Sequence, residues 1–287
     1  MSDSVFPAAV RGLTYAVTRS YDFSTIIQSA PNKSETRIQQ VRNPLWSWTL
    51  IYEFLKDNPS DIVSGLTYTD LRTLVGFGLS RAGSADDFLF TDPDDDSVTN
   101  QQLSLVNDGV GNYYSPIQRD FGGFLEDITD LNGAITVKAN GVLQTGTYSI
   151  VGPGLGIAGY SYMGRVIQWT APAAWQASHA YALNATILDP AGHVQKVTTA
   201  GTSDSSAPTW NDAGSTTTDN TVTWTDQGYN PGPAAPITAS FNFYFRVRFD
   251  KDQMALDKWA NMWWTAGGPD ATNSEAITLV SARSSAV

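Results

Sequence analysis

The chain has 287 residues, a formal net charge of −11 and no cysteine, with 41% hydrophobic and only 16% charged residues. The lack of cysteine excludes disulfides, thiolate metal sites and cysteine nucleophiles, and the negative charge argues against a general nucleic-acid binder, whose affinity comes from lysine and arginine. Enough hydrophobic residues are present to form a core, and low charge combined with many Gly, Ser, Thr and aromatic residues favours a mainly β protein.

The sequence contains no recognisable membrane or export signal. No apolar run approaches the roughly 20 residues of a membrane-spanning helix. Met1 to Pro7 has neither the basic region nor the apolar stretch of a signal peptide. We therefore expect a protein without a membrane anchor that does not use the general secretory route.

The N-terminal part predicts several strands and one helix. Thr69 and Asp70 predict the start of an amphipathic helix over residues 68–81, whose apolar stripe should pack on a sheet. The stripe consists of Leu71, Leu74, Val75 and Leu79. Strands are expected near residues 13–17, 24–28, 35–46 and 46–54. In the last of these, large apolar residues share one parity from Trp46 to Phe54 and should line one face.

An aspartate-rich turn follows a short strand at Asp87 to Phe90. Asp92, Asp94 and Asp96 have the spacing that begins an EF-hand calcium loop. The positions of the loop glycine and of the closing glutamate, however, hold serine and leucine. We interpret the segment as a solvated turn rather than a metal site.

Two strand signals in the second half of the chain are strong. Asn140-Gly141 lies between short apolar strands and predicts a hairpin with a type I′ turn. Ile237 to Asp250 predicts a long strand in which phenylalanine and valine occupy one parity and polar residues the other. Residues 251–268 are expected to be irregular or briefly helical, and Ile277 to Val280 is expected to form a closing strand.

A change of composition predicts a separate module. Residues 173–233 are rich in Thr, Ser, Ala, Asp and Trp and include the start of a proline-rich exit linker, Tyr229 to Pro236. We expect a small β module there, inserted into a body formed by residues 1–172 and 234–287 with two β lobes. Both histidines, His179 and His193, lie in the module without Glu or Cys at metal-ligand spacing. No catalytic motif was found, so we expect neither an enzyme nor a cofactor.

The order of these landmarks resembles the distal tail protein family of long-tailed bacteriophages and gene transfer agents. The matching features are Phe6-Pro7, the aromatic strand at 46–54, the leucine-rich helix, Phe88-Leu89-Phe90 before the aspartate-rich turn, the Asn140-Gly141 hairpin, and the ending from Pro236 to Asp250. Residues 100–130 match little of the family pattern. Three tryptophans, Trp259, Trp263 and Trp264, are additional to it, and their role is not given by the sequence.

The resemblance implies a fold and a structural role. The fold would be mainly β, with a β-sandwich or split-barrel ring domain and one flanking helix. The role would be that of a hexameric ring in the virion, assembled in the host bacterial cytoplasm and joining the tail tube protein to the tail-tip hub protein. Different surfaces of neighbouring subunits meet in such a ring, and DNA would pass through an acidic lumen without being retained.

The polar face of the long strand contains candidates for the contact between ring subunits. These candidates are Tyr244, Arg246 and Arg248. An alternative interpretation is that the two arginines pair with surface carboxylates of their own subunit.

The inserted module is similar to small carbohydrate-binding modules of the chitin-binding type. The similar segments are Trp175 to Tyr181, Gly192 to Thr198, Gly201 to Ser203, Ala207 to Trp210 and Asp219 to Trp224. The resemblance implies that the module binds host surface polysaccharide through the apolar faces of aromatic rings. The candidate rings are Trp175, Tyr181, Trp210 and Trp224; the alternative is that the tryptophans form the core of the module. Asn220 replaces the usual glycine, and Leu183-Asn184 stands where a Gly-Asp pair is common.

A second function class remains open at the level of sequence. The chain could be a carbohydrate-binding or glycan-degrading protein whose β body serves the tryptophan-rich module. A binding module in an enzyme is usually attached at a terminus, whereas this one interrupts the body. That arrangement favours the tail ring over the glycan-degrading protein.

Overall fold

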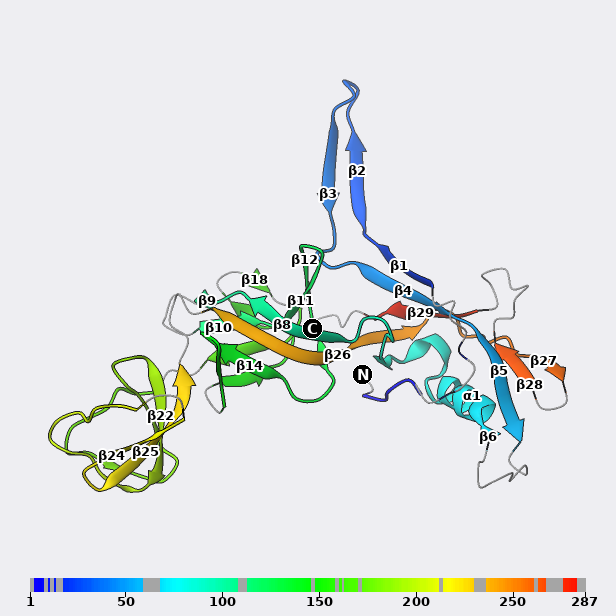
Figure 1. The fold of residues 1–287 in the computed structure, drawn as a ribbon. Helices are drawn as coiled ribbons and strands as arrows, with labels where there is room; N and C mark the ends of the chain where they lie inside the picture. The colour runs from blue at the N-terminus through cyan, green and yellow to red at the C-terminus, as the bar shows by residue number, and fades with distance from the viewer. Residues whose placement is uncertain are drawn as a thin grey trace. The chain divides into compact units, whose positions relative to one another are not determined.

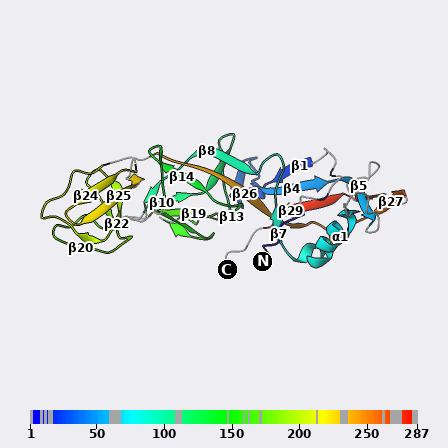
Figure 2. The same ribbon diagram turned by 60° about the horizontal axis from the view of Figure 1, so that its bottom comes forward.

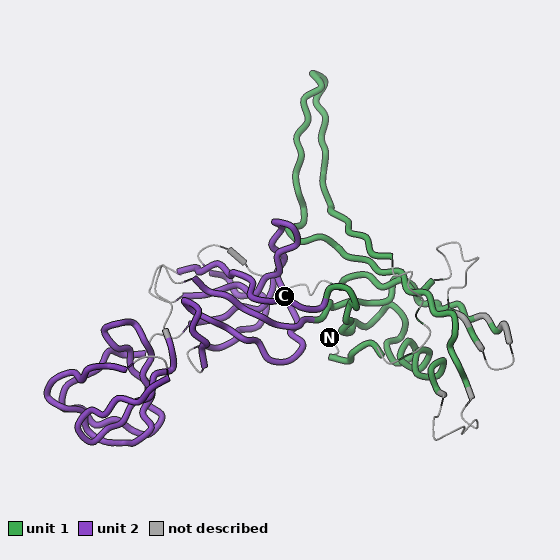
Figure 3. Tube along the Cα trace, viewed as in Figure 1, with its two compact units in different colours: residues 1–95, 244–287 green, residues 96–243 purple. Residues whose placement is uncertain are grey.

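The computed structural model describes residues 3–7, 10, 13, 18–58, 68–107, 113–145, 148–157, 160–161, 163–169, 172–211, 214–229, 236–260, 263–266 and 276–282. Within these ranges the chain is mainly β with several sheets and a single α-helix, as the sequence predicted (Figure 1). The chain divides into two compact units, unit 1 (residues 1–95 and 244–287) and unit 2 (residues 96–243) (Figure 3). The predicted module at 173–233 falls within unit 2, and its proposed boundaries stay a prediction.

The long strand predicted from alternation is present. β26 (Ile237–Phe249) is buried at every second position, from Ile237 through the four phenylalanines and Val247, while the polar parity is half-buried except at Asn242. Its first half belongs to unit 2 and its second half to unit 1. Alternate side chains of a strand point to the same face. The buried side chains of β26 therefore belong to the core of unit 2 in the first half of the strand and to the core of unit 1 in the second half.

Unit 1 contains one part of the sheet that includes β26. Its antiparallel strands, in order, are β1 (Thr18–Asp22), β4 (Leu45–Leu50), β29 (Ile277–Ser281) and β26, with β7 (Phe88–Phe90) also paired to β26. The closing strand is therefore confirmed, whereas the predicted strand at 13–17 lies largely outside the described residues. Aromatic rings pack edge-to-face in the core of unit 1. The ring centroids of Trp48 and Phe90 are 5.4 Å apart, and those of Phe77 and Phe88 are 5.0 Å apart.

A second sheet of unit 1 corrects two expectations. It consists of β27 (Asp257–Ala260), β28 (Trp263–Ala266), β5 (Tyr52–Asn58) and β6 (Tyr68–Thr69). In the described part of residues 251–268, residues 251–256 are irregular, as one alternative expected, whereas β27 and β28 are strands that the sequence did not predict. Phe54 was predicted on the buried parity but is 50% exposed, because the register of β5 shifts between Tyr52 and Leu55 and turns Leu55 inward instead.

The predicted helix is α1 (Asp70–Ser80), followed by the short 3-10 helix η1 (Gly83–Ala85). Thr69 precedes it as expected but makes no capping hydrogen bond through its side chain. Leu71 and Leu74 are buried, whereas Leu79 is 77% exposed, which contradicts its place in the apolar stripe. The helix instead packs closely at the half-buried Gly78, where an added Cβ would lie 3.3 Å from the Met254 Cε atom.

Unit 2 contains several small sheets. β8 (Ser97–Leu103), β13 (Asp130–Leu131) and β14 (Thr136–Ala139) pair with β26, and β15 (Val142–Leu143) pairs with β14. A four-stranded sheet is formed by β16 (Tyr148–Val151), β19 (Val166–Trp169), β10 (Tyr113–Pro116) and β9 (Val106–Asn107). Two hairpins are β11 (Gln118–Phe121) with β12 (Phe124–Asp127), and β17 (Gly156–Ile157) with β18 (Tyr160–Ser161).

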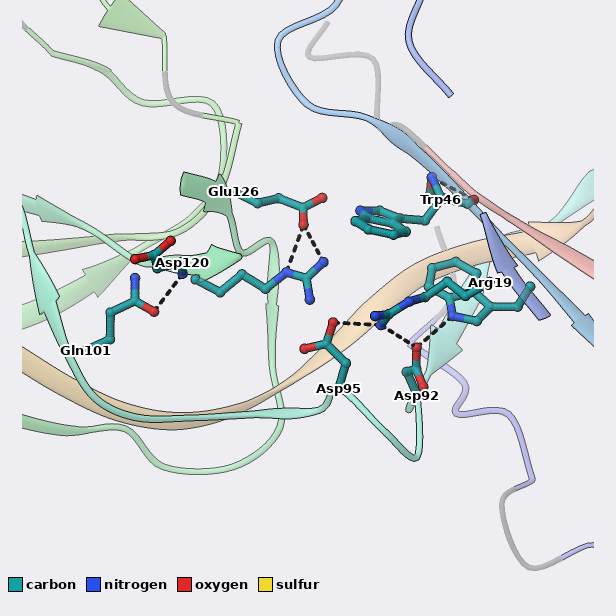
Figure 4. Close-up of polar contacts among 10 residues, drawn as sticks. Arg19, Trp46, Asp92, Asp95, Gln101, Asp120 and Glu126 are labelled. Atoms are coloured by element: carbon teal, nitrogen blue, oxygen red, sulfur yellow. Dashed lines mark hydrogen bonds and ion pairs between the residues drawn. The ribbon is translucent and has the colours of Figure 1, made fainter. Parts of the chain in front are cut away.

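Two local features of unit 2 follow directly from residue chemistry. Asn140 and Gly141 connect β14 and β15 with φ values of 51° and 81°, as a type I′ turn requires. Arg119 and Glu126 pair across the β11–β12 hairpin at 2.6 Å, and both are buried (Figure 4 shows the contact at Glu126).

The last part of unit 2 contains the predicted inserted module. A four-stranded sheet consists of β21 (Thr186–Leu188), β22 (His193–Thr199), β25 (Val222–Tyr229) and β24 (Thr216–Asp219). A further pair is β20 (Ala180–Tyr181; labelled in Figure 2) with β23 (Gly201–Thr202). These strands are antiparallel, as expected for a small all-β module.

Candidate functional site

The module has its own core, and Trp224 is at its centre. Trp224 is fully buried with Ile187, Val197 and Val222. The predicted sugar-binding role of Trp224 is therefore wrong, because a ring with no accessible face cannot stack on a sugar. The alternative that the sequence left open, a core residue of a small β module, is correct for this tryptophan.

A buried carboxylate fixes the orientation of two indoles. Asp219 accepts hydrogen bonds from the Trp175 Nε1 atom at 2.9 Å and from the Trp224 Nε1 atom at 3.2 Å, and its other oxygen accepts from the Asp204 backbone NH at 2.8 Å. The next residue, Asn220, has a φ of 53°, so asparagine adopts there the left-handed conformation that usually favours glycine. An asparagine at this position is thus compatible with the turn.

Three candidate aromatic residues keep some accessible surface. Trp175, Tyr181 and Trp210 are half-buried and pack around the module core. Tyr181 and Trp210 meet Trp224 edge-to-face, with ring centroids 4.8 and 5.8 Å away. Tyr181 also contacts the exposed His179 ring at 4.6 Å. Their packing orients these rings while leaving part of each side chain open.

The two arginines predicted at the subunit contact have partners inside unit 1. The Arg246 side chain is only 11% exposed and pairs with Asp3 at 3.2 Å and Asp87 at 3.4 Å. Arg248 donates to the Phe249 carbonyl at 2.9 Å, and Tyr244 is half-buried. For Arg246 the alternative interpretation, pairing with carboxylates of its own subunit, is therefore correct.

A projecting hairpin is the surface that sequence reasoning missed. β2 (Thr25–Ser29) and β3 (Glu35–Gln39) pair along their whole length, yet every residue of both strands is exposed (Figure 1). Large apolar side chains on and near the hairpin are open to solvent, namely Tyr21, Phe23, Ile26, Ile27 and Ile38. A two-stranded hairpin is marginally stable alone in water. The arm therefore has the character of a binding element.

Sequence contained one signal for this arm. Ile26 and Ile27 are adjacent, so both faces of the same strand are apolar. A strand with only one face on a core would alternate instead.

The base of the arm is fixed by a charged cluster in unit 1. Arg19 on β1 pairs with Asp92 at 3.0 Å and with Asp95 at 2.8 Å, and its guanidinium lies 5.1 Å from the Trp46 ring centroid (Figure 4). Asp92 is buried and also accepts from the Trp48 Nε1 atom at 2.8 Å. The expectation of a solvated turn is thus wrong for Asp92, whose long-range partners bury it.

A cavity of about 340 Å³ lies beside α1 in unit 1. Apolar side chains at its wall include Val75, Leu79, Met254 and Leu256. At its edge Asp252 accepts hydrogen bonds from the Ser84 hydroxyl and backbone NH. These bonds lower the pKa of the exposed Asp252 carboxyl.

Other chemistry finds no support in the described part of the chain. Among those residues no group of three or more His, Asp or Glu side chains is placed to hold a metal ion. The described residues include no helix with the length and apolar character needed to cross a membrane. Of the three additional tryptophans, only the side chain of Trp264 is described; it is half-buried, with the Lys258 ammonium 5.6 Å from its ring centroid.

Comparison with known proteins does not assign the chain to a family. A scan against protein-family models found no match, and a search of curated proteins found no significant one.

Proposed function

We propose that this chain is a virion structural protein, a distal tail ring adaptor that joins the tail tube to the tail-tip hub. The observation that carries the proposal is the β2–β3 arm, which exposes isoleucines on both faces. At its base, Arg19 pairs with Asp92 of unit 1. A subunit that forms a ring must present an element to its neighbour. The mainly β fold with one helix, the net charge of −11 and the ordered landmarks of the tail family also support it.

Loss of the apolar surface of the arm should prevent assembly without unfolding the subunit. Ile26 and Ile38 face each other across the hairpin, and Ile27 lies on the opposite face. Replacing all three with serine should leave circular dichroism and the unfolding midpoint nearly unchanged, because exposed substitutions typically alter stability by about 0.5 kcal/mol or less. Sedimentation velocity should show the wild-type chain as an oligomer and the triple variant as a monomer.

The hairpin offers a matched control. Gln28 and Thr36 form the neighbouring cross-strand pair on the face of Ile26. Serine at these two positions should leave the sedimentation profile of the wild type unchanged. An oligomer in the isoleucine variant of the same size as the wild type would show that the arm does not carry assembly.

The module supports a second proposal, binding of host surface polysaccharide by the ring's periphery. This second proposal is supported by three aromatic residues, Trp175, Tyr181 and Trp210, which remain partly accessible around the buried Trp224. The rings are held by packing and by Asp219 and can offer apolar edges or faces to sugars.

The tyrosine of this set allows a clean test. Tyr181→Ala should reduce binding on a polysaccharide array about tenfold, which corresponds to the roughly 1.4 kcal/mol expected for a lost aromatic contact. Tyr181→Phe keeps the ring and should bind like the wild type. Equal binding of wild type, Tyr181→Ala, Trp175→Ala and Trp210→Ala would rule out these rings as the sugar-binding surface.

A further inference from the structure

The sequence contains two Asn-Gly pairs, and they have different conformations in unit 2. Asparagine is a chemically labile residue, and it is most labile before glycine, which has no Cβ to hinder attack by its own backbone nitrogen. Asn140-Gly141 forms the turn between β14 and β15. Asn132-Gly133 lies in the connection between β13 and β14, outside both strands. The same chemistry can therefore be compared in two settings of one protein.

Deamidation of such a pair is spontaneous and consumes only water. The backbone nitrogen of the glycine loses its proton and attacks the side-chain carbonyl carbon of the asparagine. A C–N bond forms, and the side-chain amide nitrogen leaves as ammonia. Water then opens the cyclic imide at either of its carbonyls. One opening gives aspartate, and the other gives isoaspartate, in which the main chain runs through the side-chain carbon.

The turn protects Asn140 from this reaction. The φ values of Asn140 and Gly141, 51° and 81°, are both left-handed. In the left-handed conformation the next backbone nitrogen lies opposite Cβ across the Cα–C bond, so it cannot reach the side-chain carbonyl carbon. The pairing of β14 with β15 and the bond from the Asn140 backbone NH to the Pro236 carbonyl, at 2.9 Å, hold this conformation. Asn140 can therefore react only after the turn has opened.

The second pair lacks this protection. The φ of Asn132 is not in the left-handed region. Within the described part of the chain, neither the Asn132 side-chain amide nor the Gly133 backbone NH makes a hydrogen bond. Gly133 is exposed, and a Cβ added to it would meet no atom within 4 Å. Water and base can therefore reach the reacting nitrogen in the folded protein.

From these observations we propose that Asn132 is a site of spontaneous deamidation in the folded protein, while Asn140 is protected. The site lies between two contacts with β26. The Asn132 backbone NH donates to the Asn242 carbonyl at 2.8 Å, and β14 pairs with β26 from Thr136 onward. Isoaspartate adds a methylene to the main chain between these contacts, together with a negative charge, and therefore strains them. The proposal is independent of the ring function.

Peptide mass spectrometry of the folded chain after storage at mildly alkaline pH tests the proposal. Trypsin cleaves after Lys138 and so places the two pairs in different peptides. The peptide with Asn132 should be deamidated about tenfold or more above the peptide with Asn140, because only the latter reaction requires the turn to open. The control is the same chain stored in denaturing urea, where both pairs are unrestrained and should react at similar rates.

Equal deamidation of the two peptides in the folded chain, or more at Asn140, would overturn the proposal. So would an Asn132 that stays intact in the folded chain but reacts in urea. Asn132→Gln should abolish the modified peptide, because the longer side chain cyclises far more slowly. Asn132→Asp adds the charge without the extra methylene. Hydrogen exchange in β13 and β14 should be faster in aged wild type than in Asn132→Asp, and equal exchange would contradict the strain assigned to isoaspartate.

Discussion

The Asp92→Ala variant is expected to lose about 3 to 5 kcal/mol of stability in unit 1, the usual cost of removing one partner from a buried charged group. Asp92 is buried and holds Arg19 at 3.0 Å and the Trp48 Nε1 atom at 2.8 Å. Without it, a fully buried indole NH and a largely buried guanidinium lose an acceptor. Hydrogen exchange should rise in β1, β4 and the first residues of the arm, while peptides of the module keep their protection.

Asp94 provides the matched control because it is exposed and only two residues away. Asp94→Ala should change stability by about 0.5 kcal/mol or less. Calcium should stabilise neither the wild type nor the variants, since Asp92 is committed to Arg19 and Trp48. Equal effects of the two alanine substitutions on stability would contradict the structural role of Asp92. A calcium-dependent rise in melting temperature would contradict the conclusion that the turn does not bind a metal ion.

The Trp224→Ala variant is expected to destabilise the module by about 3 to 5 kcal/mol, as removal of a large buried ring typically does. The ring is fully buried against Ile187, Val197 and Val222, and Tyr181 and Trp210 pack on its edges. Asp219 would also lose one of its two indole donors. Hydrogen exchange in β22 and β25 should increase strongly, whereas β26 should be unaffected.

Leu183→Ala serves as the comparison, since Leu183 is exposed in the same module and should cost about 0.5 kcal/mol or less. Unchanged protection of β22 and β25 in Trp224→Ala would contradict the assignment of this residue to the core. Loss of glycan binding in Trp224→Ala would reflect unfolding of the module. Tyr181→Ala is therefore the sharper test of a sugar contact.

Local patterns predicted the elements that depend on local physics. β26 was expected from alternation alone, because apolar residues at every second position can be buried on one face only by an extended chain. The β14–β15 turn was expected because Asn140 and Gly141 tolerate positive φ. α1 was located to within about two residues at each end, as is usual for helix boundaries.

The failures all depend on residues distant in sequence. Asp92 was expected in solvent, but Arg19 lies 73 residues away and Trp48 lies 44 residues away, and no local pattern gives these contacts. Phe54 turned outward because β5 shifts register against β28, a strand near the other end of the chain. β28 forms because it pairs with β5, and β27 in turn pairs with β28; their tryptophan-rich sequence did not indicate either contact.

The candidate site was predictable as a set of residues but not as a geometry. Sequence placed Trp175, Tyr181, Trp210 and Trp224 in one small module, and the structure packs all four around a single core. Trp224 is the central ring because β25 lies between β22 and β24. The composition of the module does not predict that strand order. The exposed arm was missed because β2 and β3 pair with each other in a sheet of their own and are exposed along their length, so neither strand has the alternation that one buried face produces.

The native mass of the purified chain, with negative-stain images of the same sample, tests the central proposal most directly. The account predicts a hexamer seen as rings with a central hole, and conversion to monomers when Ile26, Ile27 and Ile38 are replaced by serine. A wild-type chain that remains monomeric at every concentration, alone and mixed with the tail tube and hub proteins, would contradict the ring adaptor.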